Sequence, residues 1–231
     1  MGPSDNTAVN PELLAYLLEQ VTPERKALFE QVIAERTRYI TVVLEDIYQP
    51  QNASAVLRSC DCFGVQGVHI IENRYEYQVN PKVVMGASKW LDLHRYNQEE
   101  SDNTTACIEH LRSEGYRILA TTPHTEETLL PEIPLDKPVA LIFGTELEGL
   151  SQQAIDLADG SVRIPMYGFT ESFNISVSAA LCLQSLTDRV RQSGAPWRLS
   201  ENDHDRILLE WLRRSIKRCD LLEAAFHEKN N

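Results

Sequence analysis

The sequence is poor in basic side chains. Its 231 residues include 22 Lys and Arg against 34 Asp and Glu, so the formal net charge at pH 7 is −12. Because phosphate binding depends on Lys and Arg, this balance counts against a protein that coats nucleic acid without specificity. A modifying enzyme needs only a local basic surface, and that class is not excluded.

Long apolar runs are also missing. No stretch approaches the roughly 18 consecutive apolar residues of a membrane span. Residues 1–10 are polar, and the first apolar cluster is soon interrupted by Glu19 and Gln20, unlike an export signal. We therefore expect a cytoplasmic protein that has no membrane partner.

Cysteine and histidine are few and scattered. The five cysteines include no C-x-x-C pair, and an odd, dispersed set argues against a disulfide framework. None of the six histidines lies at a metal-ligand interval from another His or Cys. We expect neither disulfides nor a metal.

What the sequence does contain is an alternation of short apolar runs with helical segments. Its length suffices for one well-packed core with additions. Short apolar strands separated by helices are typical of the α/β class, with a mostly parallel sheet covered by helices on both faces. Strands are expected at residues 40–44, 68–71, 90–96, 117–121, 139–143 and 162–165, and helices from Asn52, over 104–113, after Ser151 and over 175–191.

The two ends of the chain are expected to be helical extensions of this core. Thr22 followed by Pro23 is typical of a capped helix start, so residues 1–37 are assigned to an N-terminal helical extension. The core then covers residues 38–194. A break at Gly194-Ala195-Pro196 leads into a C-terminal helical extension, residues 195–231.

A single amphipathic helix is expected over residues 203–227. It carries a basic cluster at one-turn spacing, which consists of Arg213, Arg214, Lys217 and Arg218. This cluster is either an ordinary solvated face or a surface that contacts RNA phosphates.

Three short segments place polar residues at the carboxyl ends of predicted strands, where open α/β sheets bind ligands. The first runs from Asn52, placed to cap a helix, to Arg58. The planar, five-donor guanidinium of Arg58 suits a phosphate or a developing oxyanion. Taken alone, Arg58 could equally be an ordinary surface arginine.

The second segment, residues 143–151, contains Gly144 and Gly149 around an acidic loop. Such glycines permit a tight loop in which the backbone approaches a ligand. The segment has neither Gly-Lys-Ser/Thr nor G-x-G-x-x-G, so it is not a known nucleotide phosphate loop. Its Glu146 and Glu148 could take part in acid–base chemistry or could simply be solvated.

The third segment, residues 164–178, leaves a strand, crosses a loop and brings Ser172 and Asn174 to the start of a helix. A helix N-terminus offers unpaired N–H groups and favours negative charge. Ser172 could also be a plain helix cap. The segment lacks G-x-S-x-G, which argues against a nucleophilic serine.

Together the three segments resemble the motifs of the SPOUT RNA methyltransferases, and more narrowly of the SpoU/TrmH branch, which methylates RNA ribose. The resemblance covers about residues 41–191, and Phe173 stands where leucine is expected in many members. The matching patterns are N-x5-R from Asn52, F-G-x-E-x-x-G from Phe143 and I-P-M-x-G-x-x-x-S-x-N-x-S-V from Ile164.

The resemblance implies a knotted fold and a cofactor. The loop after Phe143 and the loop after Pro165 would pass through each other in a deep C-terminal trefoil knot, a rare exception to the rules of chain threading. The knot would hold S-adenosyl-L-methionine, largely through backbone groups. The residues expected around this cofactor are Thr121, Gly144, Ile164, Met166 and Phe173.

The resemblance also implies a catalytic arginine, Arg58, which acts with an RNA phosphate on the ribose hydroxyl. Because a guanidinium keeps its proton, we expect Arg58 to position the phosphate and stabilise the developing alkoxide. Family sites are completed across a dimer interface, so we expect a homodimer formed partly by residues 175–191. The other catalytic positions are Asn52, Glu146, Ser172 and Asn174.

The expected substrate is tRNA, and the expected target is the ribose of guanosine 18 in the D-loop. The helical ends resemble those of the tRNA enzymes of the branch, which assist tRNA binding. One alternative is ribosomal RNA or another tRNA ribose, but residues 1–37 are too few for the L30e-type domain of many ribosomal relatives. A non-catalytic RNA-binding protein with the same fold is favoured only by the acidic charge.

Overall fold

A computed structural model of the chain describes residues 8–123 and 128–230. The described residues of 37–197 form one compact unit, which we call the sheet unit. The described residues of 8–36 and 198–230 form a second one, the helical unit. In the described part of the chain, no helix has both the length and the apolar character needed to cross a membrane.

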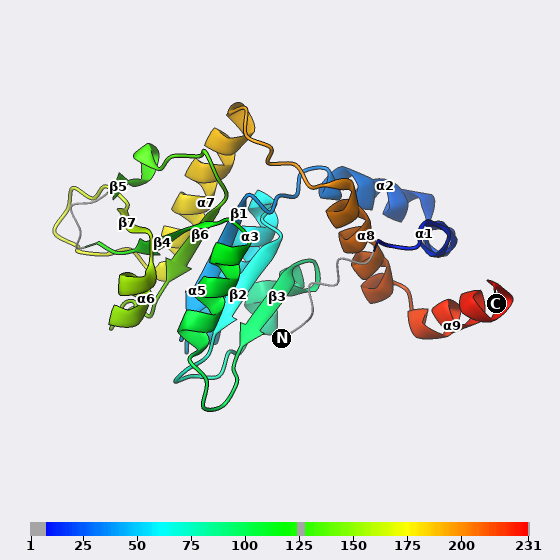
Figure 1. The fold of residues 1–231 in the computed structure, drawn as a ribbon, viewed down its shortest axis with the longest axis horizontal. Helices are drawn as coiled ribbons and strands as arrows, with labels where there is room; N and C mark the ends of the chain where they lie inside the picture. Colours follow the sequence, from blue (N-terminus) through cyan, green and yellow to red (C-terminus); the bar gives the residue numbers. More distant parts are fainter. Residues whose placement is uncertain (1–7, 124–127, 231) are drawn as a thin grey trace. The chain divides into compact units, whose positions relative to one another are not determined.

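The sheet unit is built on one parallel sheet (Figure 1). In space the described strands follow the order β3-β2-β1-β6-β4-β7-β5, which confirms the expected α/β class. The strands are β1 (Ile40–Glu45), β2 (Gly67–Ile71), β3 (Asp92–Tyr96), β4 (Arg117–Thr121), β5 (Thr128–Leu129), β6 (Val139–Phe143) and β7 (Gly160–Arg163).

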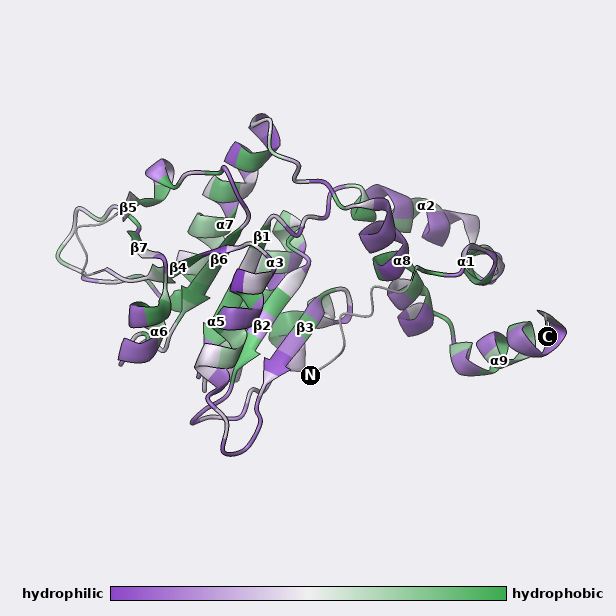
Figure 2. Ribbon diagram, viewed as in Figure 1, coloured by the Kyte–Doolittle hydropathy of each residue, from purple (hydrophilic) through white to green (hydrophobic). Residues whose placement is uncertain are grey.

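The central strands are buried because helices cover both faces of the sheet. Every residue of β1, β2 and β6 is buried, and these strands are apolar in Figure 2. Val42 and Leu44 pack on one side with α3 (Pro50–Phe63) and α7 (Ile175–Gln192). Val43 points to the other side, where α5 (Asn103–Ser113) covers the sheet. Shorter elements complete the unit, namely α4 (Pro81–Val84), α6 (Gln152–Leu157) and the 3-10 turns η1 (Ala87–Lys89) and η2 (Leu130–Glu132).

Two local expectations for this unit were wrong. The helix α3 begins at Pro50, because proline at the first helical position has no N–H to leave unpaired. Asn52 therefore lies inside the helix and does not cap it. The last strand ends at Arg163 and not at Pro165, which cannot donate a ladder hydrogen bond.

The helical unit consists of α1 (Pro11–Leu18), α2 (Pro23–Ile33), α8 (Glu201–Ser215) and α9 (Cys219–Asn230) in its described residues. The side chains of Asn10, Thr22 and Ser200 cap the first three of these helices. Phe29 of α2 packs on Trp211 of α8, with ring centroids 5.6 Å apart.

The expectation of one continuous helix over residues 203–227 was wrong. The helix α8 ends at Ser215 and α9 begins at Cys219, and between them Arg218 has a positive φ of 58°. The break allows Arg213 to reach Glu223, with Nε 2.8 Å from Oε1. In a straight helix these residues would be separated by a rise of about 15 Å. A tertiary contact thus accompanies the interruption of a helix in a stretch that contains neither glycine nor proline.

Candidate active site

The candidate site lies beyond the carboxyl ends of the strands. The chain runs from β1 outward to β2 and β3 on one side, whereas β6 and β4 lie on the other side of β1. Such a switch in strand order opens a crevice between the loops that follow the two neighbouring strands. Here these are the loops after β1 and after β6.

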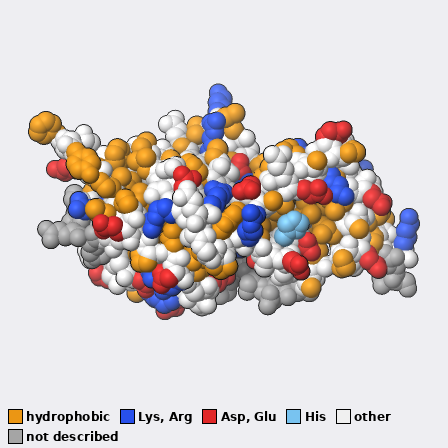
Figure 3. Space-filling view, turned by 90° about the horizontal axis from the view of Figure 1, so that it is seen from above, with side chains coloured by type: hydrophobic (Ala, Val, Ile, Leu, Met, Phe, Trp, Pro, Cys, Tyr) orange, Lys and Arg blue, Asp and Glu red, His pale blue; other side chains and the backbone are white. Residues whose placement is uncertain are grey.

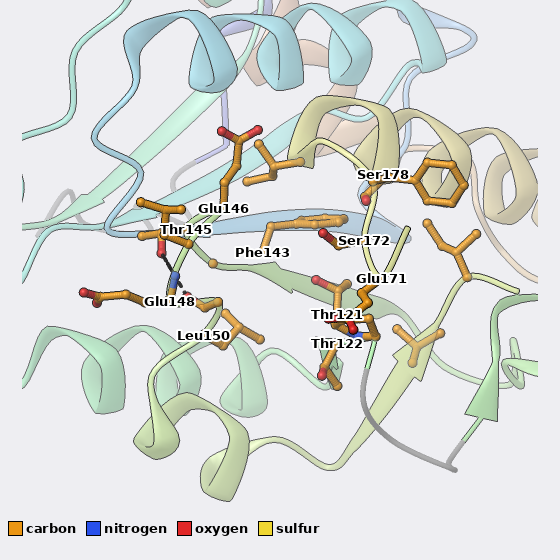
Figure 4. Close-up of a pocket in the computed structure, with 18 of the residues that line it drawn as sticks. Thr121, Thr122, Phe143, Thr145, Glu146, Glu148, Leu150, Glu171, Ser172 and Ser178 are labelled. Carbon is orange, nitrogen blue, oxygen red and sulfur yellow. Dashed lines mark hydrogen bonds between the residues drawn. The ribbon is translucent and has the colours of Figure 1, made fainter. Parts of the chain in front are cut away.

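A cavity of about 400 Å³ occupies this edge. Its walls are the segments that follow β4, β6 and β7, together with the first turns of α7 (Figure 4). All five positions expected around a cofactor line this cavity, although they come from three separate parts of the chain. They are Thr121, Gly144, Ile164, Met166 and Phe173.

The loop after β6 is a closed unit held by its own backbone. The N–H of Thr145 donates to the carbonyl of Gly149 at 2.9 Å, and the reverse bond measures 3.1 Å. A Cβ added at Gly144 would lie 2.1 Å from the carbonyl oxygen of Gly149. Glycine is required at this position because any side chain would collide with backbone.

The polar side chains that line the cavity include three carboxylates, Glu146, Glu148 and Glu171, together with hydroxyls and one thiol. The hydroxyl of Thr121 donates to the carbonyl of Ile142 at 2.7 Å, which fixes its orientation. Burial raises the pKa of Cys182 to about 12, so this lining thiol stays protonated and is not a nucleophile at neutral pH. Neither Thr121 nor Cys182 is therefore placed to attack a molecule bound in the cavity.

Beside the cavity, three of the expected catalytic residues form a polar cluster. Asn174 donates through its Nδ2 atom to Oε1 of Glu146 and to Oδ1 of Asn52, the latter at 3.2 Å. Its Oδ1 atom accepts the N–H of Ser176 at 2.9 Å and so caps α7. The first turn of α3, the loop after β6 and the start of α7 therefore meet at one asparagine.

A small recess adjoins this cluster. Asn52 and Glu146 line it together with Tyr48 and Gln49, which follow β1. Gln49 also accepts a hydrogen bond from Nδ2 of Asn52 at 2.5 Å. We did not single out Tyr48 or Gln49 from the sequence. The signal that could have found them is their place directly after a buried strand, at the switch in strand order.

The two acidic candidates of the loop after β6 have different surroundings, and their side chains point in different directions in Figure 4. Glu146 belongs to the polar cluster. Glu148 pairs with Arg74, with Oε2 2.5 Å from Nη1, and both side chains are exposed. The arrangement therefore favours Glu146 over Glu148 as the functional carboxylate.

The two remaining catalytic candidates do not join the cluster. Ser172 lines the larger cavity and is not a helix cap, because Asn174 caps α7. Arg58 is exposed on α3 and lines neither the cavity nor the recess. The structure places its guanidinium on the surface, where it is accessible to a bound macromolecule.

The expected basic cluster of the helical unit is divided by the break after α8. Arg213 binds Glu223 through Nε and Nη2, at 2.8 and 3.0 Å, and also Glu210, and these bonds raise its pKa. Arg214 lies 3.9 Å from Glu210. Lys217 and Arg218 lie in the link between α8 and α9 and form no ion pair with any described residue.

No group of three or more His, Cys, Asp or Glu among the described residues is arranged to hold a metal ion.

The comparisons with known proteins agree with this geometry. A tRNA (guanosine(18)-2'-O)-methyltransferase from Borreliella burgdorferi is 39% identical over 210 residues, which are 91% of this chain and 94% of the relative. The Thermus thermophilus enzyme of the same name is 30% identical and matches 85% of this chain and 100% of its own length. A solved structure, the A. aeolicus TrmH/SpoU tRNA modifying enzyme, has a TM-score of 0.74 at 27% identity and covers 87% of this chain and 100% of its own. The model of the SpoU rRNA Methylase family matches residues 39–184. This chain thus belongs to the SpoU methylase family, as its three motifs predicted.

Proposed function

We propose that this protein transfers a methyl group from S-adenosyl-L-methionine to the ribose 2′-hydroxyl of guanosine 18 in the D-loop of tRNA. The observation that carries the proposal is the cluster of Asn52, Glu146 and Asn174 beside a cavity lined by the segments that follow β4, β6 and β7. The names of the B. burgdorferi and T. thermophilus relatives support the same target.

The residues around the cavity fit the proposed cofactor. A volume of about 400 Å³ lies within the range of roughly 300–1,000 Å³ of small-molecule sites. When bound, S-adenosyl-L-methionine supplies an electrophilic methyl group on its sulfonium. We assign its binding to Thr121, Gly144, Ile164, Met166 and Phe173.

In the proposed mechanism the polar cluster positions the ribose. Asn174 occupies Oε1 of Glu146 and leaves Oε2 of that carboxylate to accept a hydrogen bond from the 2′-hydroxyl. Asn52 and Ser172 orient the nucleotide beside it. As the ribose oxygen takes up the methyl group, its proton passes to Oε2 of Glu146. Arg58 holds an RNA phosphate and stabilises the negative charge that develops on the ribose oxygen. Arg58 donates hydrogen bonds throughout and does not act as a base.

We also propose a homodimer in which the partner completes the site around Arg58. Hydrophobic side chains gather on the face of the sheet unit seen in Figure 3, the side on which α7 lies in Figure 1. Exposed apolar surface of this kind marks interfaces. The exposed apolar residues of α7 and of the loop before it are Tyr167, Phe169, Phe173, Val177 and Leu181.

The trefoil knot belongs to this proposal as well. In the sheet, β7 lies between β4 and β5 and so interrupts the order of the strands along the chain. In the proposed knot the loop after Phe143 and the loop after Pro165 pass through each other, which would bring both loops to one cavity. Both loops do border the cavity, which supports the proposal.

The terminal segments are proposed to assist tRNA binding as helical extensions, residues 1–37 and 195–231, of the core over residues 38–194. Lys217 and Arg218 are the candidate phosphate contacts that no described carboxylate neutralises. Arg213 and Arg214 are partly neutralised by acidic neighbours and contribute less. A tRNA-modifying enzyme of this kind acts in the cytoplasm.

The test is transfer of labelled methyl from S-adenosyl-L-methionine to unmodified tRNA, with the product mapped by nuclease digestion. We expect 2′-O-methylguanosine at position 18, and a rate reduced by about 100-fold or more in Arg58→Ala. A tRNA with 2′-deoxyguanosine at that position is the matched control and should accept no methyl. Methylation of ribosomal RNA, or of another tRNA position, would contradict the proposed target. Full activity of Arg58→Ala would contradict the mechanism.

A further inference from the structure

Glu45, the last residue of β1, is a buried carboxylate that lines neither the cavity nor the recess. Only 3% of its surface is exposed, yet both of its oxygens are hydrogen-bonded. Oε2 accepts the N–H of Ser151 at 2.9 Å, and Oε1 accepts the hydroxyls of Ser151 at 2.7 Å and Thr104 at 3.0 Å. Charged acceptors of this kind make stronger hydrogen bonds than neutral ones.

Ser151 is the residue at which the loop after β6 ends. Its hydroxyl accepts the N–H of Ala154 at 3.1 Å and so caps α6. The other end of the loop is also attached to β1, because Leu44 and Phe143 are neighbours in the parallel pair of β1 and β6. Two consecutive residues of β1, Leu44 and Glu45, therefore hold the two ends of the loop.

The shape and the position of this loop have separate causes. The bonds between Thr145 and Gly149 fix its shape from within. They do not determine where the closed loop lies relative to the cavity, since they join two parts of the loop itself. The bonds of Glu45 to Ser151 join the loop to the centre of the sheet, where β1 pairs on both sides.

We infer that Glu45 is a positioning residue for cofactor binding, which it serves by holding residues 144–150 against the cavity through Ser151. The inference rests on the proposed function, because it takes the occupant of the cavity to be S-adenosyl-L-methionine. Glu45 touches no reacting atom, and Glu146 in the same loop is also held by Asn174 of α7. The loss of Glu45 therefore weakens cofactor binding more than it lowers the turnover rate at saturating cofactor.

The experiment compares Glu45→Gln with Glu72→Gln. Glu72 is a matched control because its side chain is also buried, with 5% exposed, it directly follows β2, the neighbour of β1, and it also accepts several hydrogen bonds. Its partners are Arg95 and the N–H of Tyr77, and none of them lies on the loop after β6. In Glu45→Gln an NH₂ group replaces one of the two accepting oxygens, and the negative charge is lost. The N–H of Ser151, or the hydroxyls of Ser151 and Thr104, must then give up the acceptor, whereas the side-chain volume hardly changes.

Binding of S-adenosyl-L-methionine is measured by calorimetry on the full chain, together with the KM for the cofactor and kcat on tRNA. We expect Glu45→Gln to raise the Kd and KM for the cofactor by roughly tenfold or more, and to lower kcat less than threefold. Both variants should lower the melting temperature, but only Glu45→Gln should weaken cofactor binding.

Hydrogen exchange distinguishes a local effect on the loop from a general loss of stability. We expect faster exchange in residues 144–151 of Glu45→Gln, relative to the rest of the sheet unit, and no such local change in Glu72→Gln. An unchanged cofactor Kd in Glu45→Gln, or equal weakening in Glu72→Gln, would overturn the inference while the proposed function stands. Failure of the unmodified protein to bind the cofactor would overturn both.

Discussion

The sheet unit and the helical unit use their polar side chains in opposite ways. In the sheet unit, Asn174 and Glu146 bond to each other beside a recess, and the second carboxylate oxygen of Glu146 is left for a ligand. In the helical unit, the guanidinium of Arg213 donates hydrogen bonds to both Glu210 and Glu223. The comparison teaches that residue type alone does not mark a binding surface. What marks it is hydrogen-bonding capacity that the fold leaves unused.

The largest expected effect tests the polar cluster of the sheet unit. Asn174→Asp keeps the oxygen that caps α7 but replaces both Nδ2 bonds with a negative charge beside Glu146. We expect kcat on tRNA to fall by about 100-fold, as for the loss of a preorganised donor, with little change in melting temperature. Asn174→Ala should lose activity and also about 1 kcal/mol of stability through the missing cap. A melting temperature lowered equally by both variants would contradict this separation of roles.

The second effect concerns the loop after β6. Gly144→Ala forces a Cβ to within 2.1 Å of the carbonyl oxygen of Gly149, so the loop must shift. Overpacking of this kind costs about 1–3 kcal/mol, which corresponds to roughly 5- to 150-fold weaker cofactor binding if the shift is confined to the loop. Gly194→Ala is the control, since nothing lies within 4 Å of its added Cβ. Calorimetry should show weaker cofactor binding for Gly144→Ala alone.

The third effect is the dependence of stability on pH. Burial, and then the neighbouring His94 and His110, hold the pKa of His69 well below its usual 6.5. Burial also lowers the pKa of His94, whose ring stacks on that of His69 with centroids 4.6 Å apart. The stability contributed by these neutral rings is present above pH 6.5. This stability is lost as the pH falls towards the lowered pKa values, because the histidines then bind protons in the unfolded chain but not in the folded one.

Denaturant titrations between pH 7 and 5 measure this loss. We expect it to amount to at most about 2 kcal/mol for His69 at pH 5. Other groups near these rings are Arg38, Asp92, Tyr96 and Glu114. His94→Gln should reduce the pH dependence, whereas His227→Gln in the helical unit should not. An equal change in both variants would show that the histidine stack is not its source.

The smallest effect distinguishes the basic residues of the helical unit. Lys217→Ala should weaken tRNA binding a few-fold and reduce the slope of log K against log salt by about 1, as for one lost phosphate contact. Arg213→Ala should change that slope less and instead lower stability, since it breaks the bonds between α8 and α9. Filter binding over a salt series measures both. A larger change of slope in Arg213→Ala than in Lys217→Ala would contradict the proposal that Lys217, and not the ion-paired Arg213, contacts a phosphate.

The same comparison explains what could be predicted from the sequence. The strands over Arg117–Thr121 and Val139–Phe143 were predicted at their observed bounds, because short buried runs between charges, glycines or prolines are locally defined. The three residues of the cluster, and every expected cofactor position except Thr121, were named because they lie in the three motifs that resemble the family. Thr121 was named by the resemblance alone. Which of them touch, and that Asn174 joins the other two, required the three-dimensional arrangement.

Other features left no local signal. The break after Ser215 depends on contacts between α8 and α9, and the two-residue strand β5 depends on pairing with β7. The sequence placed Glu45 just outside the strand predicted over residues 40–44. It gave no sign of the bond to Ser151, which lies 106 residues further along the chain. Pairings at that distance are decided by the topology of the sheet, which no single segment encodes.

The double role of Asn174 makes α7 sensitive to whatever binds next to Glu146. One side of this amide holds the first turn of the helix, and the other side holds the carboxylate and Asn52. A ligand that orders Glu146 therefore reduces the freedom of Asn174, and with it the fraying of the helix end. By reciprocity, a chain in which that turn is already tight binds the ligand at a lower entropic cost. The backbone amides in the first turn of α7 thus report whether the site is occupied, without an attached label.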